Sequence, residues 1–368
     1  MRIALKMLGA CLAIAAVASV ADAPPSWSAA AATPAVAAAA VLGDHYPQAQ
    51  VAFPGGVTGL PDVTYATLMG FRPLTLDLYL PPAAKRKPGG DPVVLYIHGG
   101  GWVTGHSRQS GAFVNWPGVL ATLAARGYVV ASLNYRLSGE ARFPAAEQDI
   151  KASLRWLRAH ADKYGIDKSK ALVWGGSAGG HLAALTGVSC GVKALEPSSL
   201  ELQDLEYDIA LPAPASARAA ESSESDCVQG VVTWYGVFDF AALSSERPKA
   251  APSRPTDSSN PLVAFLGCDP SKCPAGTLDI ASPAKLVKPT DPPMLIMFGS
   301  DDKTVPPAQS KNFYKLLLAN HVKATLVELP GVGHSFVGPT LKATRDASLA
   351  ALDKTFAFID ETFGNKAN

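Results

Sequence analysis

A serine set among glycines is the clearest chemical feature of the sequence. Ser177 lies in residues 175–180 (GGSAGG), after the apolar stretch 171–174 and before a helix-forming run that begins at His181. A serine on a tight turn between a strand and a helix projects its hydroxyl above the sheet, and flanking glycines leave room for the neighbouring backbone. The positive end of the following helix favours developing negative charge. This pattern predicts that Ser177 is a nucleophile, against the alternative of a plain tight turn.

A glycine-rich loop follows an earlier apolar stretch. Residues 98–102 (HGGGW) come directly after the stretch 93–97. Bare glycine backbone can approach a bound carbonyl closely, and N–H groups in such a loop stabilise the oxyanion of an acyl-transfer reaction. We expect the amides of Gly100, Gly101 and Ala178 to form this oxyanion hole, in which one donor lowers the barrier by about 3 kcal/mol. The alternative is a flexible glycine loop.

The serine needs a general base, because its hydroxyl is a weak nucleophile at neutral pH. His334 lies in the glycine-rich segment 330–336, and the chain order serine, acid, histidine requires a late histidine. We therefore predict that His334, among the seven histidines, is the base. We expect His98 to brace the oxyanion loop, and His181 to point away from the serine and to serve packing or hydrogen bonding.

The acid that orients this base should follow a late strand between the serine and the histidine. The apolar stretch 293–298 leads to Asp301 and Asp302, which are both candidates, and Asp239 is a third. The acid accepts a hydrogen bond from the imidazole and stabilises the imidazolium without taking the proton. The residue pattern alone leaves the choice of acid open.

The elements that must position these residues alternate between strands and helices. Apolar runs and period-two alternation predict strands at residues 75–80, 93–97, 128–133, 171–174, 230–235, 293–298 and 324–328. Helical spacing of apolar residues predicts helices at residues 145–161, 307–320 and 343–363. Such alternation is typical of a mainly parallel sheet with helices on both faces.

Two long stretches interrupt this alternation. Residues 191–226 are rich in Ser, Ala, Pro and Glu, and residues 241–284 are rich in Pro, Ser and Lys. Loops of this length in a compact domain are usually functional or disordered. Both fall where a lid over an active site can be built. The sequence supports equally the interpretation of these stretches as a lid and as flexible surface insertions.

The N-terminal residues have the pattern of an export signal. Arg2 and Lys6 precede an apolar run at residues 7–20, and residues 21–23 (ADA) fit a cleavage site. Cleavage is also possible near residues 28–32, because a proline follows residue 23. The run is shorter than the ~20 apolar residues of a membrane anchor. A periplasmic or secreted protein without stable membrane insertion is therefore expected.

The expected organisation has three parts. Residues 1–23 are the signal peptide, residues 24–45 are an Ala/Pro-rich linker, and residues 46–368 form one catalytic domain that contains the two insertions. The chain carries 32 Lys+Arg and 31 Asp+Glu without a basic stripe, so no nucleic-acid partner is indicated.

Four cysteines remain after removal of the signal. An even number in an exported chain suggests disulfides. Cys268 and Cys273 lie in a tight loop that can close locally, and Cys190 and Cys227 would then bracket the segment between them. The alternative is four free thiols. No histidine lies at ligand spacing from either pair, so a zinc site is not expected.

Several motifs resemble one known family. They are YIHGGGW at 96–102, LNYRL at 133–137, FPAAEQD at 143–149 and GGSAGGH at 175–181, with further likeness at 298–306 and 331–336. These segments resemble the acetyl-esterase and feruloyl-esterase-like (BD-FAE-like) branch of the α/β-hydrolases, which is related to the hormone-sensitive-lipase-type carboxylesterases. The resemblance implies an α/β-hydrolase fold, with a mostly parallel central sheet, helices on both faces and lid-like insertions.

The resemblance also bears on the acid and on the substrate. In that family the acid precedes a Val-Pro pair by three positions, which selects Asp302, ahead of Val305 and Pro306. Gly176 stands where lipase relatives carry an acidic residue, so the likeness favours the acetyl- or feruloyl-esterase branch over lipase specificity.

The sequence as a whole predicts a serine carboxylesterase that acts through an acyl-enzyme and needs no cofactor. The expected substrate is a small-molecule or carbohydrate-linked ester of a short-chain or aromatic acid. Trp102, Trp234 and Tyr235 lie at strand ends and are candidates for substrate contacts, although core packing is the alternative. The alternative functions are an amide hydrolase, such as an arylformamidase or peptidase-like enzyme, an isoprenylcysteine-type methylesterase, and a non-catalytic binding module of the same fold.

Overall fold

The computed structural model describes residues 48–68, 70–197, 223–246 and 257–364. The predicted signal peptide and linker lie outside these residues, as do most of the first insertion and residues 247–256 of the second. In the part of the chain that is described, no helix has both the length and the apolar character to cross a membrane.

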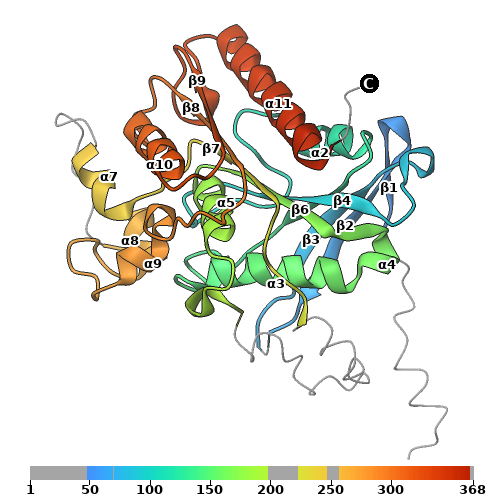
Figure 1. The fold of residues 1–368 in the computed structure, drawn as a ribbon, viewed down its shortest axis with the longest axis horizontal. Coiled ribbons are helices and arrows are strands. Elements are labelled where there is room, and N and C mark those ends of the chain that lie inside the picture. The colour runs from blue at the N-terminus through green and yellow to red at the C-terminus, as the bar shows by residue number, and fades with distance from the viewer. Residues whose placement is uncertain (1–47, 69, 198–222, 247–256, 365–368) are drawn as a thin grey trace, which may run out of the picture. The chain divides into compact units, whose positions relative to one another are not determined.

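The described residues form a nine-stranded sheet in the order β1-β2-β3-β5-β4-β6-β7-β8-β9 (Figure 1). The strands from β5 to β9 in this order pair in parallel, whereas β1, β2 and β3 form an antiparallel edge that joins them through β5. The strands are β1 (Val51–Phe53), β2 (Val57–Ala66), β3 (Leu74–Leu80), β4 (Asp91–Ile97), β5 (Val129–Leu133), β6 (Ile166–Gly176), β7 (Gly230–Trp234), β8 (Met294–Gly299) and β9 (Ala324–Leu329).

Helices cover both faces of this sheet (Figure 1). One face packs against α2 (Trp116–Ala124) and α11 (Leu341–Phe363), and the other against α3 (Ala145–Ala159), α5 (Ala178–Val188) and α10 (Pro307–Ala319). The shorter helices are α4 (Ala161–Tyr164), α7 (Phe240–Glu246), α8 (Pro261–Leu266) and α9 (Thr277–Ala281), with single 3-10 turns at η1 (Pro54–Gly56), η2 (Ala83–Lys85), η3 (Lys193–Leu195), η4 (Pro283–Lys285) and η5 (His334–Phe336).

Strand β4 shows why its sequence is apolar throughout. Val93 and Leu95 point to the core beneath α3 and α5, whereas Val94 and Tyr96 point to the core beneath α2 and α11. All four side chains are buried. A strand with helices on both faces has no solvent side, so the usual alternation of polar and apolar residues disappears.

The predicted strands and helices are all present, with ends that shift by a few residues. The sequence did not predict β1, β2 or α2, nor the short helices α4, α7, α8 and α9. Strand β2 contains Gly59 and Pro61, and its register with β3 shifts between Leu60 and Val63. Such a bulge interrupts the period-two pattern from which a strand is predicted.

The two cysteine pairs form disulfides, Cys190–Cys227 and Cys268–Cys273. The sequence left the connectivity open and favoured local closure between Cys268 and Cys273, which the structure has, so the free-thiol alternative is wrong. The first bridge joins the residues after α5 to the segment before β7, and the second closes the loop between α8 and α9. The described part of the second insertion is therefore ordered into short helices.

Candidate active site

Ser177 occupies the turn between β6 and α5. Its backbone has φ 56° and ψ −119°, a conformation that is uncommon for a residue other than glycine. Its N–H donates to the carbonyl of Trp234 in the neighbouring strand at 2.8 Å. The flanking glycines are required for packing, because a Cβ on Gly175 would lie 2.2 Å from the carbonyl oxygen of Gly179. The surrounding backbone thus holds the hydroxyl above the end of the strand.

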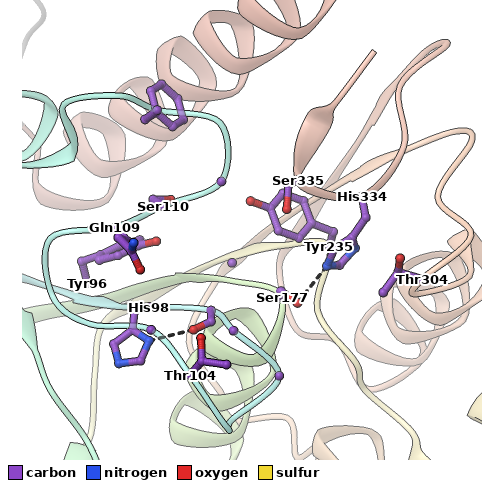
Figure 2. Close-up of a pocket in the computed structure, with 17 residues that line it drawn as sticks. Tyr96, His98, Thr104, Gln109, Ser110, Ser177, Tyr235, Thr304, His334 and Ser335 are labelled. Atoms are coloured by element: carbon purple, nitrogen blue, oxygen red, sulfur yellow. Dashed lines mark hydrogen bonds between the residues drawn. The ribbon is translucent and has the colours of Figure 1, made fainter. Parts of the chain in front are cut away.

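His334 brings its imidazole to this hydroxyl from the turn after β9 (Figure 2). Its Nε2 lies 2.8 Å from Ser177 Oγ, and its Nδ1 lies 2.8 Å from Asp302 Oδ2. The Asp302 side chain is fully buried, and its Oδ1 accepts the N–H groups of Thr304 and Val305. A carboxylate fixed in this way accepts the Nδ1 proton of His334 and leaves Nε2 as the acceptor for the serine hydroxyl.

The other two candidate acids lie elsewhere. Asp301 is exposed and its carboxylate accepts the hydroxyl of Ser300. Asp239 accepts the N–H of Ala242 at the start of α7 and forms an ion pair with Lys285. Of the three aspartates, Asp302 is therefore the one that the fold brings to the imidazole.

The glycine loop after β4 lies against the serine. Gly100 has φ 111°, and a Cβ there would lie 2.1 Å from the carbonyl oxygen of Thr104. Within the described residues, the N–H groups of Gly100, Gly101 and Ala178 have no hydrogen-bond acceptor. Ala178 is the first residue of α5, where an N–H has no partner within the helix. Gly100 and Gly101 line one cavity at Ser177, and Gly101 and Ala178 line a second.

Two buried histidines support this loop and the helix after the serine. The Nδ1–H of His98 donates to the carbonyl of Gly99 at 2.7 Å, and its ring stacks on Tyr135. The indole Nε1–H of Trp102 donates to His181 Nδ1, whose Nε2–H donates to the carbonyl of Ala281. Burial lowers the pKa of both histidines to about 4, so both are neutral at neutral pH. Both have the supporting contacts that the sequence predicted.

Two cavities meet at Ser177 and share Gly101 and Thr304 as lining residues. The larger has a volume of about 550 Å³ and the smaller about 250 Å³. Polar side chains around the larger cavity (Figure 2) are Tyr96, Thr104, Gln109, Ser110, Tyr235 and Ser335. Apolar side chains around the smaller cavity are Trp102, Val237, Leu243, Pro261, Leu262 and Val305. The serine therefore stands between a larger cavity with many polar side chains and a smaller cavity whose lining is mainly apolar.

Of the three residues predicted to contact substrate, two line a cavity at Ser177 and one does not. Trp102 lines the smaller cavity, and Tyr235 lines the larger one with its ring 4.9 Å from that of His334. Trp234 lies outside both cavities: its fully buried indole packs against Trp174 and donates to Thr355 Oγ1. The pocket prediction for Trp234 is wrong, because its side chain points into the core beneath α11.

Sequence reasoning missed several lining residues. Gln109 and Ser110 lie in a loop without a recognisable motif. Pro261 and Leu262 open helix α8, and the side chain of Asn260 caps the helix by accepting the N–H of Leu262. An Asn-Pro pair is a helix-start signal, so this wall of the smaller cavity could have been found.

Comparisons with known proteins place the chain among families of hydrolases. The sequence model of the BD-FAE family matches residues 76–317, and that of the Prolyl oligopeptidase family matches residues 275–366. Esterase LipC of Mycobacterium tuberculosis is 33% identical over 276 residues, which are 73% of this chain and 60% of LipC. The probable carboxylic ester hydrolase LipM of the same organism is 28% identical, over 67% of this chain and 50% of LipM. The chain thus spans little more than half the length of these curated relatives.

Solved structures show the same architecture. A truncated form of a carbohydrate esterase from gut microbiota aligns with a TM-score of 0.64 and 29% identity, over 84% of this chain and 98% of that one. A thermophilic esterase from Thermogutta terrifontis aligns with a TM-score of 0.60 and 25% identity, over 85% of this chain and 94% of that one.

The sheet order, the helices on both faces and these neighbours define an α/β-hydrolase fold. Within that fold the chain belongs to the BD-FAE family, whose sequence model covers most of the residues from β3 to α10.

Proposed function

We propose that this protein is a serine carboxylesterase with Ser177 as nucleophile, His334 as general base and Asp302 as orienting acid. The observation that carries the proposal is the continuous hydrogen-bond chain from Ser177 Oγ through His334 to the buried carboxylate of Asp302. Its esterase relatives in M. tuberculosis and T. terrifontis support the same activity.

The proposed reaction is acyl transfer to water. Ser177 Oγ attacks the ester carbonyl while His334 Nε2 takes the hydroxyl proton, and the amides of Gly100, Gly101 and Ala178 stabilise the oxyanion. His334 then gives this proton to the leaving alcohol, and the acyl group stays on Ser177. Water, deprotonated by the same nitrogen, attacks the acyl-enzyme and releases the acid.

The two cavities support a division of the substrate. The smaller cavity, whose lining is mainly apolar, suits a short-chain or aromatic acyl group, and the polar side chains of the larger cavity suit a hydroxylated alcohol such as a sugar. The relative whose structure is described as a carbohydrate esterase supports a carbohydrate-linked ester.

A second candidate function is amide hydrolysis. The match of residues 275–366 to the Prolyl oligopeptidase family favours it, because these residues include the aspartate and histidine of the site. The same hydrogen-bond chain serves both reactions, and they differ in the leaving group that His334 must protonate.

The proposed location is the periplasm or the outside of the cell. The two disulfides support it, since disulfides persist in oxidising compartments. Fractionation of cells that express the full chain tests it: the active protein is expected outside the cytoplasm with residues 1–23 removed, and retention of the intact chain in the cytoplasm contradicts it.

The activity is tested with p-nitrophenyl esters from C2 to C16, methyl ferulate, an acetylated sugar and N-formylkynurenine. Hydrolysis of the esters by the wild type, lost in Ser177→Ala, is the expected result. Hydrolysis of the amide alone favours the second candidate. Hydrolysis of none of these compounds by the folded protein contradicts the esterase proposal.

A further inference from the structure

Three separate parts of the chain meet at His181. Trp102 in the oxyanion loop donates its indole N–H to His181 Nδ1 at 3.2 Å, and His181 Nε2–H donates to the carbonyl of Ala281 at 2.8 Å. His181 and Ala281 are fully buried, and Trp102 is nearly so. Because one ring nitrogen must accept and the other must donate, the neutral Nε2–H tautomer alone satisfies both contacts.

Aromatic packing reinforces these hydrogen bonds. The indole of Trp102 stacks on Phe265 of α8 with a centroid distance of 4.6 Å. The imidazole of His181 lies edge-on to Phe265 at 5.6 Å and to Phe240 of α7 at 5.0 Å. The oxyanion loop and the nucleophile helix are thus attached to helices of the second insertion through one buried cluster.

This cluster adjoins the smaller cavity. Trp102 lines one wall of the cavity, and Pro261 and Leu262 of α8 line another. The backbone of Gly101, which carries a proposed oxyanion donor, is so close to α8 that a Cβ there would lie 3.2 Å from Pro261 Cβ. The distance between the two walls therefore depends on the contacts that hold α8 and α9 to Trp102 and His181.

We propose that His181 is a positioning residue that fixes the insertion helices α8 and α9 against the oxyanion loop, and so sets the length of the acyl group that the smaller cavity accepts. The assignment of the acyl group to this cavity rests on the proposed esterase function. His181 contacts no substrate: it acts through Trp102 and Ala281.

Three variants separate the contacts. Trp102→Phe removes the indole donor and keeps a ring against Phe265. In His181→Asn the amide reaches the position of Nδ1 and can still accept from Trp102, whereas in His181→Gln it reaches the position of Nε2 and can still donate to Ala281. Trp116→Phe is the matched control, because Trp116 is a fully buried tryptophan in the opposite core.

The first measurement is kcat and KM over the p-nitrophenyl ester series. Loss of either contact is expected to raise the ratio of kcat/KM for C8 over C2 about tenfold, since a widened pocket discriminates less against added methylenes. The kcat for C2 falls modestly and its KM changes little, because the oxyanion donor moves while the short acyl group still fits. Trp116→Phe keeps the wild-type profile. A chain-length profile in the Trp102 and His181 variants that superimposes on the wild type overturns the proposal.

The second measurement is independent of turnover. Hydrogen exchange of residues 257–284 is expected to accelerate about tenfold in the three variants, with exchange of the central strands unchanged. Unchanged exchange in this segment overturns the positioning role. If the wild type hydrolyses no ester, the proposed function fails, and the exchange measurement still decides whether His181 holds the insertion.

Discussion

The two ends of helix α5 are held in place by different forces. At its N-terminus lie the strained backbone of Ser177 and the neutral hydrogen bonds of His181. At its C-terminus the carbonyl of Ser189 accepts from the buried ammonium of Lys151 at 2.9 Å, which also pairs with Asp226 at 3.2 Å. Next to Ser189, the Cys190–Cys227 disulfide covalently joins this end to the segment before β7.

The contrast indicates where stability and chemistry are supplied. A helix of this length spans about 16 Å, so charges and a covalent bond at its C-terminus hold it without disturbing the charge that develops at Ser177. At the N-terminus, neutral partners avoid a fixed charge beside the oxyanion. Substitutions at the N-terminal end of α5 should therefore change activity, and substitutions at its C-terminal end should change the free energy of unfolding.

The largest effect is expected for Ser177→Ala. Removal of the nucleophile should lower kcat for p-nitrophenyl acetate about 10⁵-fold or more, because no acyl-enzyme can form. Circular dichroism should show an unchanged fold, since alanine fits the same turn. A variant that keeps a tenth of the wild-type rate would contradict the assignment.

The next effect is expected for Asp302→Asn, which should lower kcat about 10⁴-fold because the amide favours the wrong tautomer of His334. Asp301→Asn is the control, since Asp301 is exposed and contacts Ser300. Equal losses in the two variants would mean that the buried carboxylate is not the orienting acid.

The sequence predicted the site residues that follow strands more completely than the residues that line the two cavities. Ser177, His334 and the glycine loop follow buried strands, and the carboxyl ends of parallel strands meet at one edge of the sheet. The choice of Asp302 over Asp301 came from a family resemblance. The two aspartates are adjacent and have the same chemistry, so only the directions of their side chains distinguish them, and the local sequence does not give those directions. The prediction that Trp234 contacts substrate was wrong for a related reason. Whether a strand-end side chain lies in a pocket or in the core depends on which helices cover each face of the sheet, and the local sequence pattern does not contain this tertiary information.

At the other end of α5, Asp226→Ala should lower the free energy of unfolding by about 3–5 kcal/mol, because it leaves Lys151 buried without its carboxylate. Activity at low temperature should stay near the wild-type value. Glu224→Ala is the control on the same segment: its partner Lys168 is 50% exposed, so its loss should cost about 1 kcal/mol or less. Urea unfolding of both variants measures the difference, and equal midpoints would show that the buried pair contributes little.

Removal of the two disulfides should lower the free energy of unfolding by different amounts. Replacing Cys190 and Cys227 with serine opens a loop of sequence separation 37 and should lower stability by about 4 kcal/mol, whereas the separation of 5 between Cys268 and Cys273 corresponds to about 2 kcal/mol. Thermal unfolding of the two double variants gives the comparison. A larger loss from the short loop would indicate that the second bridge stabilises the insertion by packing.

The two ends of α5 should also respond to pH in opposite senses. Burial lowers the pKa of His181 from 6.5 to about 4, so the unfolded chain binds the extra proton and stability falls by about 3 kcal/mol as the pH drops from 6.5 to 4. Glu147, which accepts a hydrogen bond from Thr186 near the C-terminus of α5, has its pKa raised by burial from 4.5 to about 8. Here the folded state keeps the proton, so stability falls as the pH rises from 4.5 to 8.

Urea unfolding across pH 4 to 8 separates these two contributions. His181→Gln should flatten the acid side of the stability curve in part, because His98 titrates in the same sense. Glu147→Gln should flatten the side from pH 4.5 to 8. A curve that keeps its wild-type shape in both variants would contradict the assignment of these slopes.

The contact between the serine hydroxyl and the imidazole joins positions that are 157 residues apart. Closing so long a loop is entropically costly and is repaid only when the strands between them have paired. Catalytic competence should therefore be the last property to return during refolding, after helical signal and after the sheet core excludes solvent. The rate at which turnover recovers then reports when the segment after β9 docks onto the sheet. A spectroscopic signal that averages over all helices would not resolve this step.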